Sequence, residues 1–80
     1  MNAKVVYIDD IAVNVLMAQR RMKQKELASL AGIGRGNLSV LLKRGTVRPK
    51  TADLIAAALN VDVEEIMREP PEGEITKQED

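Results

Sequence analysis

The sequence contains no cysteine and no histidine, and these two absences exclude most kinds of catalytic and metal site. Without cysteine there are no disulfides, no thiolate ligands for zinc and no cysteine nucleophile. Without histidine, a metal site would have to consist of carboxylates, and a general base would have to be an acid or a lysine. We therefore expect no catalytic residues, no metal site and no cofactor, and we expect that the chain is not an enzyme.

Aromatic residues are nearly absent as well, since Tyr7 is the only one in the 80 residues. Apolar residues nevertheless make up 45% of the chain, so the core must consist of Leu, Ile, Val, Ala and Met, a composition that favours helices. No apolar run approaches the roughly 20 residues needed to span a bilayer, and the N-terminus lacks the pattern of a secretion signal. These features predict a small cytoplasmic protein with no membrane contact.

The formal net charge is zero, but the charges are strongly segregated along the sequence. Between residues 20 and 50, nine lysines and arginines accompany a single acid, Glu26, which gives this segment a net charge of +8. Residues 51–80 carry nine acids against Arg68 and Lys77, a net charge of −7. Many charged runs are only solvated surface, so the basic segment indicates a polyanionic partner only if a motif within it supports that interpretation.

The N-terminal residues predict a strand followed by a helix. K-V-V-Y-I at residues 4–8 is β-branched and aromatic, which is typical of a short strand, and the pair Asp9 and Asp10 supplies a helix start. Apolar residues at helical spacing then predict a first helix from Asp10 to about Met22. The apolar residues that recur at this spacing are Ile11, Val15, Ala18 and Met22, with Ala12 and Leu16 beside them.

Two short helices are predicted in the middle of the chain. Residues 24–31 form the second helix, which ends where Gly32 can adopt the left-handed conformation. Residues 35–43 form the third helix, for which Gly34 can serve as the N-terminal cap. The inward stripe of the third helix is expected to consist of Leu38, Leu41 and Leu42.

A fourth helix is predicted over residues 52–59, because Gly45 stops the third helix and Pro49 prevents it from resuming. Asn60, which tolerates the left-handed conformation, ends the fourth helix. A fifth helix is expected from Val63 to about Arg68. Its predicted start is a capping box of Asp62 and Glu65 with a hydrophobic staple between Val61 and Ile66.

Residues 69–80 contain two prolines, a glycine and five acids, a composition that predicts a flexible tail. An alternative is that residues 74–77 add a strand beside residues 4–8. The predicted fold class is accordingly all-α, a compact five-helix domain over residues 9–68, preceded by an N-terminal strand or arm over residues 1–8 and followed by the acidic tail.

The most informative stretch is Q-K-E-L-A-S-L-A-G-I-G-R-G-N-L-S-V-L-L-K, residues 24–43. Two short helices pack at a large angle only if a small residue faces the partner backbone and the turn reaches a positive φ. Ala28 and Gly32 meet these two needs. The inner corner is sealed by Leu27, Ala31, Ile33, Leu38 and Leu41.

These residues resemble the helix-turn-helix repressors of the phage Cro and XRE type. The resemblance extends from about the first helix to Ile66, roughly three quarters of the chain, and includes L-N-V-D-V-E-E-I-M, which looks like that family's usual fifth-helix start. It implies a lambda-repressor-like fold, and it implies a third helix that enters the DNA major groove. The residues then expected to contact bases are Arg35, Gly36, Ser39 and Val40.

Other residues are expected to contact phosphates and to set the position of the protein on DNA. In the family, the place of Gln24 commonly anchors a phosphate at a helix start. The remaining predicted phosphate contacts are Asn37, Lys43, Arg44, Thr46 and Arg48. Two departures from the family pattern, Lys23 and Gly34 in place of hydroxyl caps, predict weak starts for the second and third helices.

The resemblance implies a homodimeric repressor from a phage or mobile element, which binds a palindromic double-stranded DNA operator. No small-molecule ligand is evident. The dimer interface is expected at the strand 4–8, which could pair with its twin, or at the fifth helix. The alternative functions are the antitoxin of a toxin–antitoxin pair, whose acidic tail folds on the toxin, and a protein-interaction module that does not bind DNA.

Overall fold

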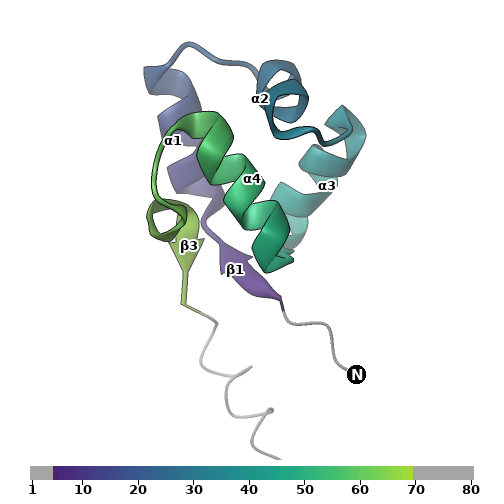
Figure 1. The fold of residues 1–80 in the computed structure, drawn as a ribbon, viewed down its shortest axis with the longest axis vertical. Helices are drawn as coiled ribbons and strands as arrows, with labels where there is room; N and C mark the ends of the chain where they lie inside the picture. Colours follow the sequence, from purple (N-terminus) through teal and green to yellow (C-terminus); the bar gives the residue numbers. More distant parts are fainter. Residues whose placement is uncertain (1–4, 70–80) are drawn as a thin grey trace, which may run out of the picture.

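The computed structural model of the protein describes residues 5–69, which form four α-helices, one 3-10 helix and a three-stranded antiparallel sheet (Figure 1). The helices are α1 (Asp10–Gln19), α2 (Gln24–Ala31), α3 (Arg35–Arg44), α4 (Pro49–Leu59) and the 3-10 helix η1 (Val63–Ile66). The strands are β1 (Val6–Ile8), β2 (Thr46–Val47) and β3 (Met67–Arg68). The predicted acidic tail and the alternative strand at residues 74–77 lie outside the described residues.

Local signals account for most helix ends. The Asp9 carboxylate accepts a hydrogen bond from the Ala12 backbone N–H at 3.1 Å, so the predicted start of α1 is confirmed. Gly32 and Gly45 end α2 and α3 with φ of +74° and +84°, in the left-handed region that glycine enters without a steric penalty. Asn60 ends α4 in the same way, with φ of +62°.

The prediction of an all-α fold with one N-terminal strand is confirmed in part: the described residues are mostly helical, but the helices are joined to a small three-stranded sheet. Its strand order is β2-β1-β3, with Tyr7 opposite Thr46 on one side and opposite Arg68 on the other. The strand expected at residues 4–8 is therefore confirmed over residues 6–8 as β1, but as the central strand. Because both of its edges are hydrogen-bonded, β1 has no edge free for a twin.

The prediction of a fifth α-helix is wrong. Residues 63–66 form one 3-10 turn, and Asp62 makes no side-chain cap; the Glu65 N–H instead donates to the Asp62 carbonyl at 2.9 Å. The chain extends at once into β3, because Met67 pairs with Ile8. Tertiary pairing thus ends the helix before a second turn can form, although its local sequence favours a capping box.

The fourth helix begins three residues earlier than predicted. Pro49 occupies its first turn, with Arg48 as the N-cap residue. Proline suits this position because its fixed φ is helical and the missing N–H has no partner within the helix in the first turn. The interpretation of Pro49 as a residue that only blocks the preceding helix missed this second role.

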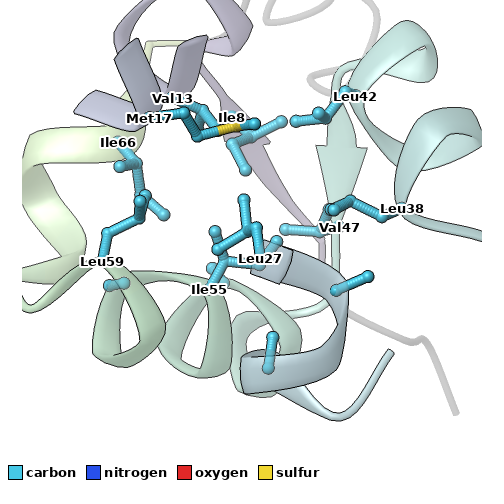
Figure 2. Packing of buried hydrophobic residues seen from close by; sticks show 14 residues of the cluster. Ile8, Val13, Met17, Leu27, Leu38, Leu42, Val47, Ile55, Leu59 and Ile66 are labelled. Atoms are coloured by element: carbon cyan, nitrogen blue, oxygen red, sulfur yellow. The ribbon is translucent and has the colours of Figure 1, made fainter. Parts of the chain in front are cut away.

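A single apolar core unites the helices and the sheet (Figure 2). Leu27 of α2, Leu38 of α3 and Ile55 of α4 are completely buried in it, and α3 packs against α2 and β2. The other core residues are Ile8, Val13, Met17, Ala28, Ala31, Leu42, Val47, Ala52, Ala56, Leu59 and Ile66. No helix within the described part of the chain is long and apolar enough to cross a membrane.

The face of α1 that packs against the core is not the face on which the sequence has its most regularly spaced apolar residues. Val13 and Met17 are buried, whereas Ile11 and Val15 are 70% and 49% exposed. Both pairs have the i, i+4 spacing of one helical face, so the sequence alone does not decide which pair is buried. The buried pair is set by the neighbouring elements, since α1 packs beside η1 and its buried Ile66.

Candidate nucleic-acid interface

Helices α2 and α3 form a helix-turn-helix unit with the small contact and turn that the sequence predicts. Ala28 is 2% exposed, and its carbonyl accepts a hydrogen bond from the Ile33 N–H at 2.9 Å across the turn. Gly32 reverses the chain between them with its positive φ. This arrangement sets the path of the turn that leads from α2 into α3.

The outward face of α3 contains the residues predicted to contact bases. Because Leu38 and Leu42 are buried against the core, the opposite side of the helix faces solvent. Val40 is 56% exposed, and Ser39 is half-buried at the border of the exposed surface. The exposed residues along this face are Arg35, Gly36, Val40 and Lys43, which we call the α3 face together with Ser39.

Gly36 is not required by the packing of the protein itself. A Cβ added at this position would meet no atom within 4 Å, and its φ does not lie in the left-handed region. Glycine inside a helix nevertheless costs roughly 0.5–1 kcal/mol relative to alanine. The absence of a side chain at Gly36 therefore leaves the α3 backbone accessible at this position. The packing of the protein does not require a glycine there.

The residues predicted to contact phosphates lie on and around α3, and they differ in how far they are exposed to solvent. Asn37 and Arg48 are exposed, while Gln24 at the start of α2 and Thr46 in β2 are half-buried. The Arg44 guanidinium does not extend freely into solvent, since its Nε and one Nη each donate to the Thr46 carbonyl at 3.3 Å. This contact ties the end of α3 to the edge strand β2.

The starts of α2 and α3 lack side-chain caps, as the sequence predicts. Lysine has no hydrogen-bond acceptor, so Lys23 cannot cap α2, although its own N–H donates to the Glu26 carboxylate at 2.9 Å. Gly34 likewise offers no side chain at the start of α3. The first-turn N–H groups of both helices thus have no capping side chain and can bind an anion.

Positive charge is concentrated around this unit. All nine lysines and arginines between residues 20 and 50 are exposed. Five of them are not among the DNA contacts predicted from the sequence, namely Arg20, Arg21, Lys23, Lys25 and Lys50. Lys25 and Lys50 lie in the first turns of α2 and α4. The signal for Lys50 was the proline before it, which marks a helix start.

Apart from Glu26 of α2, the acidic side chains of the described residues lie outside the helix-turn-helix unit. Asp53 of α4 and Asp62, Glu64 and Glu65 at η1 are all exposed. Within residues 5–69, no group of three or more acidic side chains is arranged to hold a metal ion. The chain therefore separates its charges by element, with the basic residues on and around the helix-turn-helix unit.

Comparisons with known proteins agree with this geometry. No curated protein matches the sequence. Among solved structures, a mutant of hydroxyethylphosphonate dioxygenase has a TM-score of 0.69 and 26% identity over 81% of this chain, and cadmium-bound PhpD has a TM-score of 0.68 at the same identity. This chain spans only 14% of the length of either protein. The family model of the Cro/C1-type helix-turn-helix DNA-binding domain matches residues 12–72, and the chain belongs to that family.

Proposed function

We propose that the protein is a sequence-specific regulator of transcription, a Cro-like repressor that binds a palindromic operator in double-stranded DNA as a homodimer. The observation that supports this function best is the exposed α3 face on a helix whose other side is fixed by Leu38 and Leu42. A rigid helix with short or cationic outward side chains fits the major groove, where base edges are accessible.

We assign Arg35 to base recognition, and we expect its contact to contribute more to base discrimination than that of any other residue of the α3 face. Its guanidinium can donate two hydrogen bonds to guanine O6 and N7, a contact that contributes roughly 1–3 kcal/mol of discrimination. Val40 is suited to the methyl group of thymine, and Ser39 to a polar base edge. Gly36 allows the α3 backbone to approach the bases closely.

Phosphate contacts are assigned to residues on either side of α3. Lys43 and Arg48 are exposed cations, and Gln24 lies at the start of α2, where backbone N–H groups favour an anion. Asn37, Arg44 and Thr46 complete the set predicted from the sequence. We add Lys25 and Lys50 because both are exposed in the first turn of a helix.

A dimer follows from the size of the α3 face. One recognition helix contacts only about half of an operator, so two copies related by a two-fold axis would recognise two half-sites about 34 Å apart. The palindromic symmetry of the operator would then match the symmetry of the protein.

The test is selection of duplexes from a random pool, followed by affinity measurements at several salt concentrations. We expect one palindromic sequence to be enriched and its affinity to fall steeply with salt. Arg35→Ala should relax the preference at one base pair in each half-site by about 5- to 150-fold, the equivalent of 1–3 kcal/mol. Arg68→Ala, which removes the same charge from β3, is the control and should leave base preference unchanged.

A second candidate function is a protein-interaction module that does not bind DNA. The observation in its favour is that similar structures form a small part of much longer chains, one of which is described as a hydroxyethylphosphonate dioxygenase. Absence of an enriched sequence, together with affinity that does not vary with salt, would support this candidate over the repressor. The antitoxin alternative depends on residues 69–80, nearly all of which lie outside the described residues.

A further inference from the structure

Helix α1 presents an apolar stripe to solvent on the side opposite its buried residues. Ile11, at 70% exposed, is the most exposed of the large apolar residues within the described part of the chain, and Val15 is 49% exposed. Ala18, also exposed, continues the same side at the i, i+4, i+7 spacing of one helical face. We call Ile11, Val15 and Ala18 the α1 stripe. A continuous apolar stripe of this kind is typical of a helix that packs against a partner.

The two dimer surfaces predicted from the sequence do not offer a comparable contact. Strand β1 is hydrogen-bonded on both sides, and η1 is a single 3-10 turn of four residues. The outer strand β2 lies beside α3, and its Thr46 carbonyl already accepts two bonds from Arg44. The α1 stripe, in contrast, is regular in spacing and accessible.

The charges at the two ends of α1 indicate which partner fits. Asp9 and Asp10 stand at its N-terminal end, whereas Arg20 and Arg21 follow its C-terminal end. If two α1 helices pack antiparallel, the acidic end of each lies next to the arginine end of the other, and the helix dipoles are opposed. The surface is therefore complementary to itself, as an isologous two-fold contact requires.

We propose that α1 is the dimer interface, on which a second copy of this chain packs its own α1 antiparallel across a two-fold axis near Val15. Ile11 of each copy then lies against the small Ala18 of the other. In Figure 1, α1 and α3 lie on opposite sides of α4, so α3 is not part of this contact. The inference deepens the proposed dimeric function and rests on it.

The small size of the stripe sets the strength expected of this dimer. A helix of ten residues is about 15 Å long, which provides much less than the roughly 800 Å² per partner of a stable interface. The free protein should therefore dimerise weakly. Two copies held on adjacent half-sites have a much higher effective concentration, and the same contact then makes operator binding cooperative.

Cross-linking tests the interface without DNA, and the absence of native cysteine makes each introduced thiol unique. Val15→Cys should yield a covalent dimer with a short bis-maleimide at high protein concentration, at several times the yield of Leu30→Cys. Leu30 is the matched control because it is an apolar residue of α2 that is 64% exposed. Equal yields from the two variants would overturn the proposal, whatever the protein does with DNA.

A second variant tests the role of the interface on the operator. Val15→Glu should abolish cooperative binding to a palindrome, with affinity for an isolated half-site within about twofold of wild type. Its thermal melting should also stay close to that of wild type, since Val15 is not in the core. Unchanged cooperativity would contradict the α1 dimer. Failure of the wild type to bind any DNA would instead contradict the proposed function, and the cross-linking result would still decide the interface.

Discussion

Gly36 is a residue at which protein stability and DNA affinity are expected to change in opposite directions. Gly36→Ala should raise the free energy of unfolding by about 0.5–1 kcal/mol, because alanine favours the helix and its Cβ meets no atom within 4 Å. The same methyl group should lower operator affinity if the α3 backbone approaches the bases. Urea unfolding and operator titration of the same preparation measure the two effects.

Gly45→Ala is the matched control for this experiment. It adds the same methyl group at the end of α3, also with no atom within 4 Å, but at a φ of +84°. It should therefore destabilise the protein, by about 1 kcal/mol. If Gly36→Ala binds the operator as well as wild type does, close backbone approach at this position is wrong.

The N-cap of α1 provides a prediction about stability alone. Asp9→Ala should lower the free energy of unfolding by about 1 kcal/mol, because the Ala12 N–H loses its acceptor. Asp62→Ala should have a much smaller effect, since Asp62 makes no side-chain cap at η1. Chemical denaturation of both variants at neutral pH checks the difference, and equal losses would show that the cap bond contributes little.

Helical periodicity predicted which side chains of α3 face outward, but it did not predict all of their contacts. Helical periodicity from Leu38 places Arg35, Gly36 and Val40 on the exposed side, and the structure agrees. The bond from Arg44 to the Thr46 carbonyl was not predictable, because it depends on the turn into β2. Local periodicity determines direction, whereas side-chain hydrogen bonds require the tertiary path of the chain.

Helices bounded by local signals were predicted more closely than those governed by distant partners, although α4 begins three residues before its predicted start and α1 ends at Gln19 and not near Met22. The bounds of α2 are those predicted from the sequence, since they depend on the nearby Gly32 and on apolar periodicity. The fifth helix failed because β3 must extend to pair with β1, a contact between residues far apart in sequence. The buried side of α1 was ambiguous for the same reason, because Ile66 of η1 helps to select it.

The central position of β1 predicts that the N-terminal strand is part of the folded domain and not a separate arm. Ile8 is 1% exposed, so Ile8→Ala should cost about 2–5 kcal/mol of unfolding free energy. That loss is a large fraction of the stability expected for a small domain. Val5→Ala, at a site 51% exposed, is the control and should change the stability by about 0.5 kcal/mol or less.

Thermal or urea unfolding measures the effect of these two substitutions. A small loss for Ile8→Ala would mean that β1 can detach while the helices stay folded, and residues 1–8 would then be an arm. A large loss, together with a single cooperative transition, would mean that the sheet joins the two ends of the helical unit. Deletion of residues 1–8 should then also unfold the protein.

The net charge of the whole chain does not describe how its charges are distributed, and this distribution is what matters for binding. The sequence totals zero, yet residues 20–50 carry a net charge of +8 and are all placed on or next to the helix-turn-helix unit. Exposed charges more than about 10 Å apart are largely screened at moderate salt. A polyanion at the α3 face therefore interacts mainly with the charges nearest to it, and α3 itself carries Arg35, Lys43 and Arg44 and no acid.

This separation predicts a steep dependence of operator affinity on salt for a protein with no net charge. Each phosphate contact contributes about 0.9 to the slope of log K against log salt concentration. Lys43→Ala removes one contact from each copy, so the slope for the dimer should decrease in magnitude by about 2, with affinity lost evenly across operator sequences. Arg68→Ala removes the same charge from β3, outside the helix-turn-helix unit, and should change the slope by less than about 0.5. If the two variants lower the slope equally, net charge controls binding, and the assignment of phosphate contacts around α3 is wrong.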